Sequence, residues 1–163
     1  MTFLAIDFET ANRYPNSACA IGLVRVRHNQ IINKKAFLIK PPYNLFEYSH
    51  VHGITFDDVK QQPTFRQLWP RIKKYFDEID FAVAHNASFD VAVLKSCCQT
   101  YGLEMPDVEF RCTMKLSRTV LQIKPANLFH VCRELFIPLT HHDAGSDAEA
   151  CAKIMIEVLK RGG

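Results

Sequence analysis

A short apolar run near the start of the chain leads into two acidic residues that share one face. Residues 3–9 read Phe-Leu-Ala-Ile-Asp-Phe-Glu. Successive side chains of a β-strand point to opposite faces, so Asp7 and Glu9 would lie on one face and Ile6 and Phe8 on the other. An acid in an apolar strand needs a partner, because burying it alone is costly. The run predicts a strand that presents two carboxylates for a function, and the alternative is a pair of exposed strand-end acids.

The remaining pattern predicts an α/β fold. Strands are expected at 18–27 and 31–40, joined by a short polar turn, so that the first three strands form an antiparallel meander. The later elements are expected to be a helix at 64–76, a strand at 81–84, a helix at 88–101, a strand at 108–111, helices at 113–121 and 127–136, and a helix at 144–161. A loop with one short helix is expected before Pro63, and Pro70 predicts a kink or a late start in the helix at 64–76.

This order of elements matches a ribonuclease-H-like architecture. It implies a mixed five-stranded sheet, a three-strand antiparallel meander plus two parallel strands, with helices on both faces. In open α/β sheets, ligands bind at the carboxyl ends of the parallel strands. Asp7 and Glu9 would lie at such an end.

Composition fits one compact domain over residues 1–163. The chain has 163 residues, of which 48% are hydrophobic and 23% charged, enough for a sizeable core. Its net charge of +3 is too small for binding nucleic acid by charge alone. Asp7 interrupts the first apolar stretch, so no signal peptide or membrane segment is expected and a cytoplasmic location follows. The six cysteines lack paired metal-binding spacing and are expected to be free.

Two further patches place acids at the starts of predicted helices. Residues 85–90 read His-Asn-Ala-Ser-Phe-Asp, and Asp147 begins the last helix. Alone, Asp90 or Asp147 could be an ordinary first-turn acid favoured by the helix dipole. Together with Asp7 and Glu9 they make a set of four carboxylates, which suits divalent ions of the magnesium class. His85 and its neighbour are expected to shape the turn before the helix.

A histidine near the third patch can accept a proton. Histidine titrates near the working pH of most enzymes, which suits a general base that activates water. His142 precedes Asp147 by five residues and would lie on the loop before the helix. The adjacent His141 could equally be a surface or packing residue. The register to Asp147 favours His142 as the base.

The three patches, in this order, resemble the three motifs of the DEDD exonucleases. The spacing from His142 to Asp147, with no tyrosine four residues before Asp147, resembles the histidine subclass (DEDDh) of the DnaQ-like 3′–5′ exonucleases in the ribonuclease-H-like superfamily. The segment 50–55, His-Val-His-Gly-Ile-Thr, is similar to the substrate-side loop of that family. The resemblance extends over nearly the whole chain, from residue 4 to about residue 160.

The resemblance implies a role for each motif residue, with His142 as the general base. Two divalent ions, Mg²⁺ or Mn²⁺, would be held by four carboxylates: Asp7, Glu9, Asp90 and Asp147. Four side chains would lie beside the terminal nucleotide: Thr10, Val51, His52 and Phe89.

The implied activity is hydrolysis of DNA or RNA from the 3′ end, expected on a single strand, with release of nucleoside 5′-monophosphates. Two alternatives stay open, a proofreading accessory with a DNA polymerase as partner and a catalytically silent nucleic-acid-binding module. Strand preference depends on loops around 13–17 and 42–50, whose shapes the sequence leaves open. DNA versus RNA and monomer versus dimer also stay open.

Overall fold

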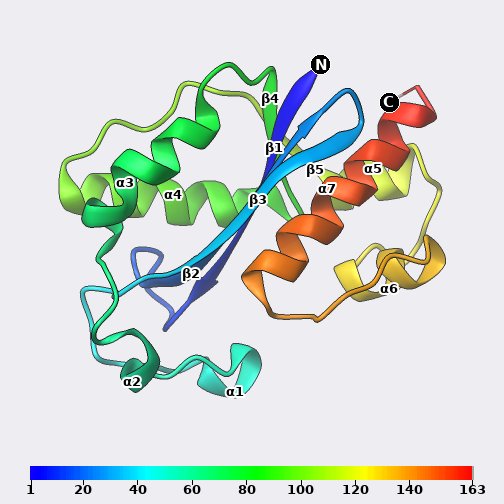
Figure 1. Ribbon diagram of the computed structural model, residues 1–163. Helices are drawn as coiled ribbons and strands as arrows, with labels where there is room; N and C mark the ends of the chain where they lie inside the picture. The colour runs from blue at the N-terminus through cyan, green and yellow to red at the C-terminus, as the bar shows by residue number, and fades with distance from the viewer. Residues whose placement is uncertain (163) are drawn as a thin grey trace.

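The computed structural model of the protein describes residues 1–162, so Gly163, the last residue of the expected domain, lies outside the described residues. A five-stranded sheet in the order β3-β2-β1-β4-β5 forms its centre (Figure 1). The strands are β1 (Thr2–Thr10), β2 (Ala18–Arg27), β3 (Gln30–Leu38), β4 (Phe81–Ala84) and β5 (Phe110–Cys112). β1, β2 and β3 pair antiparallel, whereas β4 pairs parallel with both β1 and β5. The expected meander with two parallel strands is confirmed.

Helices cover both faces of the sheet (Figure 1). They are α1 (Ser49–His52), α2 (Phe56–Val59), α3 (Phe65–Lys73), α4 (Ala87–Tyr101), α5 (Thr113–Thr119), α6 (Leu128–Glu134) and α7 (Ala144–Lys160). Leu4 and Ile6 of β1 pack in one core with α3 and α4, while Phe3 and Ala5 pack in a second core with α6 and α7. The side chains of Asp7 and Glu9 lie on the same face of β1 as that of Ala5, because every second residue of a strand points to one side. They therefore face α7, as the alternation predicts.

Several expected boundaries are wrong by a few residues. β3 ends at Leu38 instead of residue 40, and β5 covers Phe110–Cys112 instead of 108–111. Within residues 1–162, β5 is short because it pairs with a single strand, the four-residue β4, which aligns with it from Ala82 onward. The helices expected at 113–121 and 127–136 are also shorter, and the loop before Pro63 holds two short helices instead of one.

The expectation of a late start for α3 is wrong, because a capping box fixes its first turn. The side chain of Thr64 accepts a hydrogen bond from Gln67 N, and the Gln67 side chain accepts one from Thr64 N. Pro70 lies inside this helix, which passes into a 3₁₀ turn at Lys74–Phe76. Its buried apolar face consists of Phe65, Leu68, Trp69 and Ile72.

The start of α7 rests directly on β2. A Cβ atom at Gly22 would overlap the carbonyl group of Ala144, so only glycine allows this approach. Gly22 is also the cross-strand neighbour of Asp7. The first turn of α7 is therefore held over the end of β1, beside its two acids.

All six cysteines are free, as the sequence predicts. Within residues 1–162, none of the helices combines the length and the apolar character needed to cross a membrane.

Candidate active site

Three of the four predicted carboxylates meet at the carboxyl end of β1. Oxygen atoms of Asp7, Glu9 and Asp147 lie within 4.8 Å of one another. β1 supplies the first two, and the first turn of α7 supplies Asp147, whose side chain is buried. The close contact between Gly22 and Ala144 explains how an acid 140 residues away from Asp7 reaches the same point.

The fourth carboxylate, Asp90, lies beside this group and ties α4 to β1. Its side chain is only 1% exposed, and its Oδ1 accepts a hydrogen bond from Phe8 N at 3.0 Å. β1 pairs with β4 only up to Ala5, so the amide of Phe8 meets a carboxylate where the strand ladder has ended. Asp90 stands outside the set of three mutually close acids, yet after burial its charge contributes most to the raised pKa of Asp7.

Burial disfavours the ionised form of all four acids, and the charges of neighbouring carboxylates add to this effect at Asp7, Glu9 and Asp90. Burial raises the pKa of Asp7 well above its usual value, and the charges of Asp90 and Asp147 raise it further. Burial also raises the pKa of Glu9 to about 8 and that of Asp90 to about 8, although amide donors partly offset the effect on Asp90. In Asp147, burial raises the pKa against the opposing influence of His141.

Two carboxylate oxygens of this cluster have no hydrogen-bond partner among residues 1–162. Asp7 Oδ2 and Asp147 Oδ1 are both buried and unpaired. Buried polar atoms are normally satisfied, so an orphaned oxygen calls for an explanation such as a bound ion. An all-oxygen group of mutually repelling carboxylates fits a hard divalent cation, which would relieve both the repulsion and the missing bonds.

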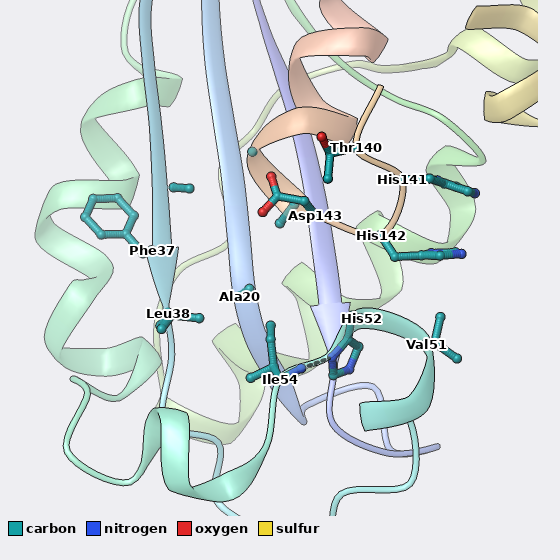
Figure 2. A pocket seen from close by; sticks show the side chains of 13 residues that line it. Ala20, Phe37, Leu38, Val51, His52, Ile54, Thr140, His141, His142 and Asp143 are labelled. Atoms are coloured by element: carbon teal, nitrogen blue, oxygen red, sulfur yellow. Dashed lines mark hydrogen bonds between the residues drawn. The ribbon is translucent and has the colours of Figure 1, made fainter. Parts of the chain in front are cut away.

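The loop before α7 brings two histidines to Asp147. Asp147 Oδ2 accepts a hydrogen bond from His142 N at 3.1 Å and lies 3.3 Å from His141 Nδ1. The two imidazoles are stacked with their centres 3.8 Å apart and project in the same direction (Figure 2). Burial, followed by the neighbouring His141, lowers the pKa of His142, which keeps its ring neutral near pH 7. Both histidines therefore adjoin the acidic cluster.

The four predicted substrate residues line two pockets. Val51 and His52 border a pocket of ≈ 430 Å³ together with both stacked histidines (Figure 2). Thr10 and Phe89 border a second pocket of ≈ 170 Å³. A hydrogen bond joins the two walls, because His52 Nε2 donates to the carbonyl oxygen of Thr10 at 2.9 Å. Ile54 N donates to His52 Nδ1 at 3.1 Å, which fixes the neutral tautomer of that ring.

The second pocket contains side chains that sequence reasoning missed. Its wall includes Asn12, Arg13, Tyr14 and Tyr48, from the two loops on which strand preference was expected to depend. The loops are held together, since Arg13 Nη1 lies 2.9 Å from Glu47 Oε1. No pattern in the sequence relates these segments, because Arg13 and Glu47 lie 34 positions apart in irregular loops.

His85 stabilises the turn that leads into α4. Its Nε2 donates to the carbonyl oxygen of Ala126 at 2.9 Å, and its Nδ1 accepts from Thr113 Oγ1 at 2.9 Å. Burial lowers the pKa of His85 to about 4, consistent with a neutral ring that bonds through both nitrogens. The next residue, Asn86, has a left-handed backbone (φ 72°) and begins the helix that carries Asp90.

The sheet order is that of a ribonuclease-H-like fold, and the acidic cluster at the end of β1 is a group of side chains that could hold a metal ion. A family model described as "Exonuclease" matches residues 4–155, nearly the whole chain. The chain belongs to this exonuclease family, and the resemblance to DnaQ-like exonucleases drawn from the three motifs is confirmed.

Curated relatives support the same family and are far longer than this chain. "DNA polymerase III PolC-type" of Thermotoga maritima is 28% identical over 172 residues, which cover 99% of this chain and 12% of the relative. "3'-5' exonuclease DinG" of Bacillus subtilis is 29% identical over 167 residues, which cover 98% of this chain and 18% of the relative. The chain thus spans less than a fifth of the length of either protein.

Solved structures share the fold over almost the entire chain. Exonuclease X in complex with 5′ overhanging duplex DNA superposes with a TM-score of 0.79 at 24% identity, covering 97% of this chain and 91% of that one. The nuclease domain of 3'hExo, a DEDDh family member bound to rAMP, gives a TM-score of 0.84 at 17% identity, covering 99% of this chain and 92% of that one. At these identities the likeness is one of fold.

Proposed function

We propose that residues 1–163 act as a single domain, a 3′–5′ exonuclease of the histidine (DEDDh) subclass that hydrolyses the terminal phosphodiester of DNA or RNA and releases nucleoside 5′-monophosphates. The observation that carries this proposal is the meeting of Asp7, Glu9 and Asp147 within 4.8 Å, beside the buried Asp90. The B. subtilis relative that bears the name of a 3′–5′ exonuclease supports the polarity.

Four acids would hold two divalent ions, Mg²⁺ or Mn²⁺: Asp7, Glu9, Asp90 and Asp147. Their raised pKa values and the two unpaired buried oxygens support this assignment, because bound cations would stabilise the ionised carboxylates. Two such ions, when bound, lower the pKa of a water and neutralise the charge that develops on the phosphate.

His142 would accept the proton of the attacking water. A general base must be unprotonated at the working pH, and the lowered pKa of His142 favours the neutral ring. Its backbone amide is bonded to Asp147, which keeps the imidazole close to the acidic cluster. His141 is bonded to the same carboxylate through its ring, so its imidazole is less available to a water.

Thr10, Val51, His52 and Phe89 would position the terminal nucleotide. Val51 is 41% exposed and Phe89 is 44% exposed, which leaves two apolar side chains on the surface where they could pack against a sugar and a base. Thr10 and His52 are joined by a hydrogen bond that would keep the two pockets in a fixed relation.

A proofreading role with a DNA polymerase is the second candidate. It is favoured by the relatives named DNA polymerase III PolC-type, which match this chain over 99% of its length. Co-purification of a polymerase in stoichiometric amount would support it. A catalytically silent binding module is disfavoured, because all four acids and His142 are present. We expect the protein to work in the cytoplasm, a reducing compartment in which six free cysteines are stable.

One panel of substrates tests the proposal. The purified protein is incubated with Mn²⁺ and end-labelled single-stranded DNA, duplex DNA, RNA and dinucleotides, and the product ladders are compared. Stepwise shortening from the 3′ end, with mononucleotide 5′-phosphates as the released product, is the expected result. The absence of metal-dependent mononucleotide release from every substrate would contradict the proposal.

A further inference from the structure

A second group of metal-binding side chains adjoins the carboxylate cluster. Ligand atoms of His141, His142 and Asp147 lie within 4.8 Å of one another. Both imidazoles project from the loop in the same direction as stacked rings, 3.8 Å apart (Figure 2). Asp147 is 4% exposed, and its Oδ1 has no hydrogen-bond partner within residues 1–162. The cluster thus includes a buried acceptor oxygen that is still free to bind a ligand.

The loop that carries these side chains is already fixed by hydrogen bonds. Thr140 N donates to Ser146 Oγ at 2.8 Å, and Asp143 N donates to the carbonyl oxygen of Thr140 at 3.2 Å. His142 has a left-handed backbone (φ 64°), an uncommon conformation for a histidine, and its amide is bonded to Asp147. Zinc bond lengths of about 2.0–2.1 Å place the ligand atoms of a tetrahedral site roughly 3.3 Å apart. His141 Nδ1 and Asp147 Oδ2 already lie 3.3 Å apart.

The donor atoms of this group differ from those of the carboxylate cluster. Two imidazole nitrogens and one carboxylate oxygen suit Zn²⁺ and related transition metals, whereas Mg²⁺ prefers oxygen ligands alone. Three protein ligands leave one position for water or a phosphate oxygen in a tetrahedral zinc site. Asp147 belongs to both groups, so the two sites share a ligand.

We propose that His141, His142 and Asp147 form a second metal site, which binds Zn²⁺ and inhibits the enzyme. Zinc at this site would bind the imidazole of His142 and the carboxylate of Asp147. The binding part of this inference stands on the geometry alone. The inhibitory part rests on the proposed exonuclease function, in which His142 is the base.

Zinc binding is measured directly on the metal-free protein, by competition with a chromophoric chelator. We expect His141→Asn to weaken the affinity for Zn²⁺ at least about tenfold, since even outer-shell changes around metal sites cost 10–100-fold. Asp7→Asn leaves the three proposed ligands intact and is expected to bind Zn²⁺ as the wild type does. His28→Asn is the matched control, because His28 is exposed, lies in a turn with φ 49° and is not one of the three ligands.

The outcomes separate the two sites. Loss of zinc affinity in Asp7→Asn, with or without loss in His141→Asn, would place the ion in the carboxylate cluster and overturn the proposal. Failure of the wild type to bind Zn²⁺ more tightly than His141→Asn would also overturn it. Thermal unfolding of each variant verifies that the comparison is made on folded protein.

Inhibition is then measured with Zn²⁺ added to assays that contain Mg²⁺, each variant being compared with its own zinc-free rate. We expect the zinc concentration for half-inhibition to rise about tenfold in His141→Asn, in proportion to the loss of affinity. Equal inhibition of the wild type and of His141→Asn by Zn²⁺ would overturn the inhibitory role of the site. Should no nuclease activity be found at all, the proposed function fails while the chelator measurement still decides the metal site.

Discussion

The two adjacent histidines differ in how they approach Asp147. His141 contacts the carboxylate through its ring, while His142 does so through its backbone amide and leaves its ring unbonded to that acid. If His142 is the base, His142→Ala should reduce the rate by about 10²–10⁴-fold with little effect on Mg²⁺ binding, as is typical for loss of general-base catalysis. Single-turnover rates at saturating Mg²⁺ provide the measurement.

The comparison with His141→Ala makes this test decisive. His141 has no part in the proposed proton transfer, so the rate should fall far less in that variant. A larger loss of rate in His141→Ala than in His142→Ala would show that His141, and not His142, is the general base.

The sequence predicts some residue contacts and not others. The shared face of Asp7 and Glu9 follows from strand alternation, a local property, and the structure has both on the α7 side. The bond from His52 to the carbonyl oxygen of Thr10 joins residues 42 positions apart, and the contact of Arg13 with Glu47 joins two irregular loops. Such contacts depend on the path of each loop, which no periodicity encodes.

At the level of elements, the approach of α7 to β2 positions Asp147. Gly22→Ala places a methyl group against the carbonyl of Ala144, so α7 must shift away from the sheet. We expect this overpacking to lower the free energy of unfolding by about 1–3 kcal/mol and to reduce activity, because Asp147 moves with the helix. Denaturant unfolding and nuclease rates measure the two effects.

Gly102→Ala is the matched control for this prediction. Gly102 ends α4 with φ 63°, and nothing lies within 4 Å of a Cβ placed there. Alanine in that left-handed position should cost about 1 kcal/mol of stability through backbone strain alone, with activity retained. Full activity in Gly22→Ala, despite its expected loss of stability, would show that α7 does not need this contact to position Asp147.

The types and order of the elements were predictable, and their ends less so. Apolar periodicity identified α3, and Thr64 identified its first residue, yet Pro70 suggested a late start that the capping box prevents. β5 was misplaced because its length is set by pairing with β4 rather than by its own composition. Boundaries that depend on a neighbouring element are the ones that sequence patterns miss.

For the whole molecule, the buried acids predict how stability depends on pH. Burial raises the pKa of Glu9 and of Asp90 to about 8, so between the ordinary carboxyl pKa of about 4 and about 8 the folded protein binds more protons than the unfolded chain. The contribution of these acids to stability is therefore lost as the pH rises through this window. The melting temperature of the metal-free protein should fall between about pH 6.5 and pH 8, a range above most histidine titration.

Divalent cations should reverse this fall. The proposed Mg²⁺ or Mn²⁺ ions would bind the ionised carboxylates, so their stabilising effect should be larger at about pH 8 than at about pH 6.5. About 1 kcal/mol corresponds to roughly 2–4 °C for a domain of this size, which thermal scans resolve. A melting temperature that rises with pH in the presence of a chelator would contradict the burial and mutual repulsion of these acids.

We propose that the carboxylate cluster is a metal-dependent 3′–5′ exonuclease site, and the Asp7→Asn variant provides the sharpest test. Asparagine preserves the size of the side chain while it removes the charge beside Glu9, Asp90 and Asp147. The measurement follows a 5′-labelled single strand with Mn²⁺, for the wild type and for this variant. We expect a ladder that shortens from the 3′ end with the wild type, and no turnover by folded Asp7→Asn. Undiminished turnover by that variant would show that the carboxylate cluster is not the exonuclease site.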